Sequence, residues 1–179
     1  MGGASRRMGR DKALVEVDGV PMATRVAAVL DAAGCHPVVA VGGDAAVHAR
    51  LGLPAVPDRW PGEGPLGALV TVLGAFDPDV DAVVVVACDL PWLDGATVNA
   101  LIARFIAAAG SADAVVAHSD RLEPLCAVWA CQAHRPLERL VLEGERAVHR
   151  ALESLRVVTV QVDPSAVANV NSPADLPGG

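Results

Sequence analysis

Short hydrophobic runs alternate along the chain with longer segments in which apolar residues recur at helical spacing. The strongest run, residues 81–91 (DAVVVVACDLP), is continuously apolar, which predicts a strand buried on both faces of a sheet. Further strands are predicted at residues 13–17, 37–41, 54–56, 113–117, 124–130 and 156–162. The last of these alternates, so we expect it at a sheet edge or on a half-exposed face.

The segments between these runs carry the signals of helix ends. Asp44 and Asp94 stand where N-caps are expected, and Gly34 and Gly110 stand where helices should end. Helices are predicted at residues 21–33, 44–51, 66–75, 94–109, 133–143 and 145–155, with a short one near 173–176. The regular alternation of strands and helices predicts an α/β fold with a mostly parallel central sheet covered on both faces.

The sequence pattern gives no sign of a boundary between domains. The chain shows no internal repeat, low-complexity tract or linker, so residues 1–179 are predicted to form a single domain. In open α/β sheets, ligands bind beyond the carboxyl ends of the strands. The loops to examine are therefore residues 42–44, 57–65, 88–91 and 118–123, together with the opening loop.

Composition narrows the class of protein. Hydrophobic residues make up 53% of the 179 residues, which indicates a folded chain, and aromatic residues only 3%, so the core must be built from Ala, Val and Leu. A net charge of −7 argues against a general nucleic-acid surface. We expect no membrane span, because no run of 18 apolar residues occurs, and no secretory signal, so the expected location is the cytoplasm.

Cysteine, histidine and serine offer no recognisable site. The four cysteines form no CxxC pair and sit in or beside apolar stretches, as expected for small buried residues in a reducing compartment. The five histidines lack ligand spacing, and no serine lies in a nucleophile elbow. Triad hydrolase chemistry is therefore unsupported.

The opening loop concentrates positive charge in an acidic chain. Gly2 and Gly3 allow the backbone to approach an anion closely, and Arg7 and Lys12 add charge that suits phosphate. The loop matches neither GxxxxGK[ST] nor GxGxxG. Two interpretations stay open, an anion-binding loop and a solvated basic start to the chain.

Asp89 lies at the carboxyl tip of the predicted central strand, and Pro91 ends strand pairing shortly after it. A carboxylate in this position suits a Mg²⁺ ion that also takes phosphate oxygens of a substrate. The alternative is an N-cap for the next helix, but Asp94 already serves that purpose.

Two further segments contain candidate residues. Asp58 begins the loop DRWPGEGPLG, which leads into a helix whose N-terminus favours anions, and Trp60 is either a core residue or a lid over a ring. Asn169 and Asn171 alternate in ANVNSPADL, so both can face one side of an extended segment. The alternative for this second segment is an ordinary helix start at Asn-Ser-Pro.

Together these segments resemble a known family, the nucleotidyltransferases that make molybdopterin guanine dinucleotide. GGASRRMGRDKALVEVDG resembles their signature LAGGxSxRMGxDKxLxxxxG, and GPLGAL, CDLPWL, RLEPLCAVW, GERAV and NVNSPADL follow in the family's order. The resemblance implies a Rossmann-like three-layer sandwich and the transfer of GMP from GTP to the terminal phosphate of molybdopterin or the molybdenum cofactor. It also implies Mg²⁺ as cofactor, GTP and the pterin as partners, and downstream cofactor-insertion proteins as a further possibility.

The resemblance also implies roles for individual residues. Gly2 and Gly3 would lie against the nucleotide, Lys12 would hold the GTP phosphates, and Arg7 would help neutralise them. Asp58 would contact the nucleotide side of the site, and Asp89 would bind Mg²⁺ and the α-phosphate. Asn169 and Asn171 would lie on the pterin side or near the metal.

One departure from the family pattern concerns the sheet. The family signature follows a strand of the type VVLAGG, and Met1 stands where the alanine before the glycines would be. We therefore expect the first strand to be missing from this chain and two neighbouring strands to be left with unpaired backbone groups. The alternatives to the guanylyltransferase are a cytidylyltransferase for the same pterin, a sugar-phosphate nucleotidyltransferase, or a truncated non-catalytic paralogue.

Overall fold

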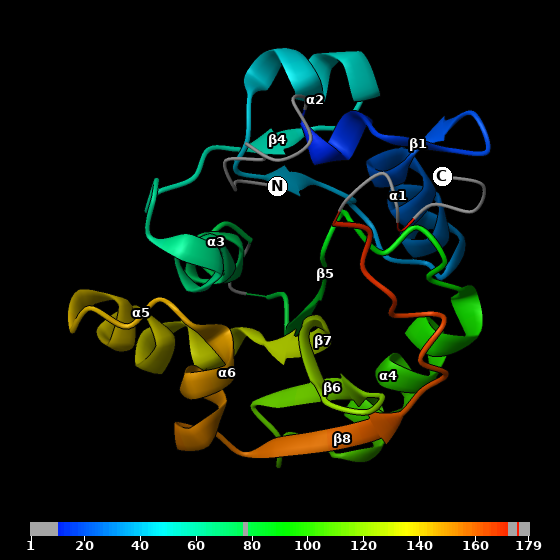
Figure 1. Cartoon of the computed structure of the whole chain (residues 1–179). Coiled ribbons are helices and arrows are strands. Elements are labelled where there is room, and N and C mark those ends of the chain that lie inside the picture. The colour runs from blue at the N-terminus through cyan, green and yellow to red at the C-terminus, as the bar shows by residue number, and fades with distance from the viewer. Residues whose placement is uncertain (1–10, 77–78, 172–174, 176–179) are drawn as a thin grey trace.

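The computed structural model describes residues 11–76, 79–171 and 175, and these form alternating helices and strands (Figure 1). The α-helices are α1 (Met22–Ala32), α2 (Ala45–Leu51), α3 (Gly64–Leu73), α4 (Gly95–Ala107), α5 (His134–Leu142) and α6 (Val148–Ala151). The 3₁₀ helices are η1 (Lys12–Leu14), η2 (Cys131–Ala133) and η3 (Leu152–Ser154). The strands are β1 (Glu16–Val17), β2 (Val20–Pro21), β3 (Ala40–Val41), β4 (Ala55–Val56), β5 (Ala82–Val86), β6 (Ala114–His118), β7 (Leu122–Ala130) and β8 (Val157–Gln161).

The main sheet has the strand order β5-β7-β6-β8. β6 and β8 are parallel, whereas β7 is antiparallel to both β5 and β6. Strands β5, β6 and β8 therefore share one direction, and β7 alone runs against them. The prediction of an α/β fold is confirmed, but the expected mostly parallel sheet is a mixed one. The reason is the short connection at residues 119–121, because a hairpin turn joins antiparallel neighbours and a parallel crossover needs many more residues.

Helices cover both faces of the strands, which gives three layers (Figure 1). Helices α3, α5 and α6 pack on one face in a cluster that includes the fully buried residues Leu66, Trp129 and Leu137. Helices α1 and α4 pack on the other face, where Val98 and Leu101 are fully buried. Most buried residues are Ala, Val or Leu, as the composition predicts. In the described segments, no helix has both the length and the apolar character needed to cross a membrane.

Several predicted strands are shorter than expected, and the run 81–91 is a strand only at Ala82–Val86. The segment 13–17 begins as the 3₁₀ helix η1, because the Asp11 carboxylate accepts a hydrogen bond from the N–H of Ala13 at 2.9 Å and turns the chain. The segment 37–41 is a strand only at Ala40–Val41, and it begins with Pro37, which has no N–H to donate. The short helix predicted near 173–176 lies almost wholly outside the described residues.

A cavity of about 860 Å³ separates the main sheet from the small parallel sheet of β3 and β4. It runs beside β5 from Val80 to Asp89, and its other walls include Val39 near β3, Leu30 of α1 and Leu69 of α3. β5 is paired with β7 along one edge only, and no ladder joins β3 to β5 within the described part of the chain. The cavity therefore lies along an edge of β5 that pairs with no strand of the described residues.

An apolar strand fused ahead of Met1 is expected to stabilise the protein. An extension of about six β-branched residues is long enough to run beside β5. It would bury apolar surface and pair backbone groups along the edge of β5 that pairs with no strand of the described residues, so we expect the Tm to rise on the order of 5 °C. A Gly/Ser extension of equal length is the control, and calorimetry measures both. Equal melting temperatures for the two extended chains would contradict this account of the cavity.

Asp113, just before β6, forms hydrogen bonds with Arg156, just before β8, and so links the starts of the two strands. Its carboxylate accepts hydrogen bonds from Arg156 through the backbone N–H at 2.9 Å, Nε at 3.1 Å and Nη2 at 2.7 Å. The backbone N–H of Asp113 in turn donates to the Arg156 carbonyl at 2.8 Å. The side-chain hydrogen bonds from Arg156 hold the pKa of Asp113 below its usual value of 3.8. The carboxylate therefore stabilises the fold above about pH 4, and this contribution disappears as the pH falls through the lowered pKa.

Asp113→Asn is expected to lower the Tm by roughly 3 °C at pH 7, because the partly exposed ion pair and one charge-assisted bond are lost. The difference from the wild type should shrink at pH 3, because below the ordinary carboxyl pKa protonation of this group favours the unfolded wild-type chain. Thermal unfolding at both pH values measures this. Asp120→Asn, at an exposed position, is the matched control. A destabilisation that is the same at pH 3 and pH 7 would show that the charge of Asp113 is not what stabilises this junction.

Candidate functional site

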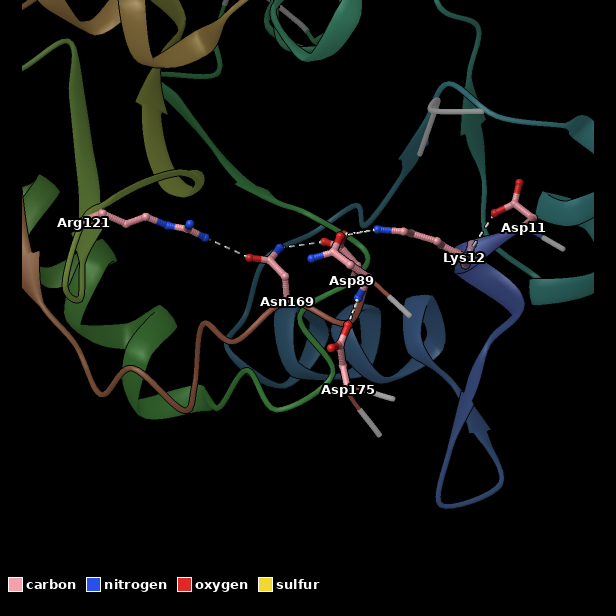
Figure 2. Close-up of polar contacts among 8 residues, drawn as sticks. Asp11, Lys12, Asp89, Arg121, Asn169 and Asp175 are labelled. Atoms are coloured by element: carbon pink, nitrogen blue, oxygen red, sulfur yellow. Dashed lines mark hydrogen bonds and ion pairs between the residues drawn. The ribbon is translucent and has the colours of Figure 1, made fainter. Parts of the chain in front are cut away.

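The candidate site lies just beyond the end of β5, where Asp89 sits at the centre of a polar cluster (Figure 2). The β5 ladder is extended by one bond, because the N–H of Ala87 donates to the Leu125 carbonyl at 2.7 Å. The chain then leaves the sheet, and the side chain of Asp89 is 17% exposed. This is the carboxyl-end position that the sequence predicts for it.

Lys12 reaches Asp89 from a segment 77 residues earlier in the sequence. Its place is set by η1, which Asp11 caps and which buries Ala13 completely. The Lys12 ammonium lies 3.2 Å from Asp89 Oδ2 and donates to Asn171 Oδ1 at 2.6 Å. A cation, a carboxylate and an amide from three distant segments therefore meet at one point.

The segment 169–171 brings in both asparagines. Val170 is fully buried with Val15 and Met22, and its N–H donates to the Asp89 carbonyl at 3.0 Å. Because side chains alternate along an extended segment, burial of Val170 turns its two neighbours toward the site. Asn169 Nδ2 donates to Asp89 Oδ1 at 3.1 Å, so both oxygens of Asp89 are engaged. The alternation in the sequence correctly predicts that the two asparagines face one side.

The electrostatics of the cluster suit an anionic ligand with a hard cation. Across residues 11–76 and 79–171, no three His, Cys, Asp or Glu side chains gather as a ready-made metal site. Asp89 supplies one carboxylate, and the asparagines supply amide oxygens, which are the ligand types that Mg²⁺ accepts alongside substrate phosphates. Burial raises the pKa of the adjacent Cys88 thiol to about 11, so this cysteine is a neutral thiol at pH 7 and no nucleophile.

Asp58 lies in a different hydrogen-bonded group from Asp89. Its Oδ1 accepts hydrogen bonds from the N–H of Trp60 at 2.9 Å and from Thr71 Oγ1 at 3.1 Å. These bonds fix the loop that leads into α3. Trp60 of this loop packs so closely on α3 that a Cβ added at Gly67 would stand 2.8 Å from the Cβ of Trp60, which leaves no room for a side chain there. Trp60 packs against the core cluster under α3, which favours the core interpretation over the lid.

The remaining predicted residues, Gly2, Gly3 and Arg7, lie outside the described residues. Two residues that sequence reasoning did not single out do join the cluster. Arg121 donates from Nη2 to Asn169 Oδ1 at 3.4 Å, and Asp175 accepts from the N–H of Asn171 at 2.7 Å (Figure 2). The signal for Arg121 was its place in the loop 118–123, at the carboxyl end of a strand.

Comparison with known proteins places this geometry in a family. The family model of the MobA-like NTP transferase domain matches residues 1–162. The chain is 36% identical over 185 residues to a probable molybdenum cofactor guanylyltransferase of Opitutus terrae, with 97% of this chain and 89% of the relative covered. It is 34% identical to the molybdenum cofactor guanylyltransferase of Rhodobacter capsulatus, covering 98% and 89% of the two chains.

Solved structures agree with the fold. Molybdopterin-guanine dinucleotide biosynthesis protein A from Archaeoglobus fulgidus superposes with a TM-score of 0.80 at 27% identity, covering 97% of this chain and 91% of that one. The manganese complex of Rv0371c from Mycobacterium tuberculosis shares the fold with a TM-score of 0.67 at 20% identity, covering 88% and 83%. Since the family model spans most of the chain and the relatives exceed 30% identity over nearly all of it, the chain belongs to the MobA-like NTP transferase family.

Proposed function

We propose that this protein transfers GMP from GTP to the terminal phosphate of molybdopterin or its molybdenum-bound form and releases pyrophosphate. The family membership supports a nucleotidyltransferase, and the relatives named molybdenum cofactor guanylyltransferase support the choice of nucleotide and acceptor. The single observation that carries the proposal is the meeting of Lys12, Asp89, Asn169 and Asn171 at the end of β5.

The chemistry of this transfer suits a site without a strong base. The attacking group is a phosphate that is already ionised at neutral pH, so no proton has to be removed to create the nucleophile. The difficulty lies in bringing two polyanions together and in stabilising charge on the α-phosphorus oxygens and the leaving pyrophosphate. Lys12 supplies a positive charge at this position, and its flexible side chain can exchange the Asp89 carboxylate for a phosphate.

Asp89 is the residue proposed to hold magnesium, together with phosphate oxygens of the nucleotide. Magnesium is commonly bound by one or two carboxylates plus substrate phosphates, and Asp89 supplies one such carboxylate. When bound, the ion supplies positive charge that neutralises the phosphates. The proposal also assigns Gly2 and Gly3 to the nucleotide and Arg7 to neutralising the triphosphate.

Magnesium-dependent binding of GTP is the first expected result. Calorimetric titration of the chain with Mg·GTP and then Mg·CTP should give saturable binding of GTP and much weaker binding of CTP. A preference for CTP would favour the related cytidylyltransferase. Absence of binding to either nucleotide would favour a non-catalytic paralogue.

In the same protein, Lys12→Ala and Asp89→Ala are each expected to lower turnover with GTP and molybdopterin by about 10²–10³-fold, the cost typical of losing a preorganised charge at the reacting phosphate. Circular dichroism should show that both variants remain folded. Arg104→Ala, at an exposed position of α4, is the matched control for loss of a positive charge. Near-wild-type turnover in either site variant would exclude the role proposed for that residue.

Asp58 allows a test that separates structure from nucleotide binding. Asp58→Ala and Thr71→Val both remove hydrogen bonds from the loop before α3, so both are expected to lower the free energy of unfolding by about 1–2 kcal/mol. If Asp58 also contacts the nucleotide, only Asp58→Ala should weaken GTP binding, by about tenfold or more. Equal GTP affinities in the two variants would leave Asp58 with the structural role alone.

A further inference from the structure

The hairpin between β6 and β7 carries a cation to the side of Asp89 that is opposite Lys12. Arg121 ends the turn at residues 119–121 and extends toward the asparagine beside Asp89 (Figure 2). Its Nη2 lies 3.4 Å from Asn169 Oδ1, and 71% of its side chain is exposed. Arg121 therefore belongs to the site by position while remaining open to a ligand.

The base of this arginine is held in place by the hairpin itself. Arg121 Nε donates to Glu123 Oε1 at 2.8 Å, and Glu123 is only 14% exposed. The N–H of Ser119 donates to the Arg121 carbonyl at 3.0 Å, which closes the turn. Gln161 of β8 donates to the Ser119 carbonyl at 3.3 Å and ties the turn to the neighbouring strand. These hydrogen bonds hold the turn and the Nε end of the Arg121 guanidinium in place.

Asn169 is oriented as a link between two charges. Its amide Nδ2 donates to Asp89, which leaves its Oδ1 to accept from Arg121. Of the five N–H donors of a guanidinium, the hydrogen bonds to Glu123 and Asn169 use two. The donors that remain suit a planar, two-point contact with a phosphate, which arginine makes better than lysine.

The reaction needs positive charge at two places, because both of its substrates are anions. Lys12 lies on one side of Asp89, and Arg121 lies beyond Asn169 on the other. With Lys12 assigned to the nucleotide phosphates, the second cation is free for the second anion. We propose that Arg121 binds the terminal phosphate of the acceptor and positions it for attack beside Asp89, an inference that rests on the proposed function above.

The test varies the two substrates separately. In Arg121→Ala, KM for molybdopterin is expected to rise about tenfold or more, whereas KM for GTP and the calorimetric affinity for Mg·GTP should change less than about twofold. Arg121→Lys should recover part of the loss, because it keeps the charge but not the two-point contact. Glu123→Gln should give an intermediate KM, since it weakens the support of the guanidinium.

Arg135→Ala removes an exposed arginine from α5 and serves as the control, with both KM values expected to match the wild type. The inference is overturned if KM for molybdopterin is unchanged in Arg121→Ala, or if KM for GTP rises instead. Both results leave the proposed function intact, since the wild type still transfers GMP. A wild-type protein that binds Mg·GTP but forms no product with molybdopterin would overturn the proposed function, and the role of Arg121 with it.

Discussion

The hydrogen bond from the N–H of Val170 to the carbonyl of Asp89 is the contact on which the site depends. It attaches the last described stretch of chain to the tip of β5, and burial of Val170 beside Val15 and Met22 holds it there. The same buried group supports η1, from which Lys12 extends. One small apolar cluster thus brings together segments that lie 77 and 159 residues apart, and the polar contacts of the site follow from it.

Much of the fold could be predicted from the sequence because the strongest signals are local. Asp44 and Asp94 cap helices α2 and α4 as expected, with bonds of 2.7 Å from Ala46 and from Thr97. The direction of β7 could not be read from its hydrophobic run, because a buried strand looks the same in either direction. It depends on the length of the connection to β6. The predicted strands 113–117 and 124–130 are separated by only six residues, too few for a parallel crossover, so the antiparallel pairing could have been predicted from this spacing.

The part of the site that lies directly after a predicted strand could be predicted from the sequence. Asp89 follows the strongest strand, and the alternation of Asn169 and Asn171 indicates a shared face. The bond between Asn169 and Arg121 could not be foreseen, because it depends on how far a hairpin extends past the edge of the sheet. For Asp58 the sequence suggested a binding residue, whereas the structure shows local hydrogen bonds to Trp60 and Thr71 that shape a loop.

The reversed strand β7 has a consequence for how such a protein can diverge. Val86 of β5 is paired with Cys126, so the first residues of β7 continue beyond the last pair and carry the turn out over the site. The turn belongs to the site, while the residues that hold the sheet together lie further along the same strand. Changes in the sequence or length of the turn can therefore alter which acceptor is favoured without disturbing the packing of Trp129 or the ladder with β5. Under the role proposed for Arg121, acceptor preference and folding stability depend on separate parts of one hairpin, where selection can act on each independently.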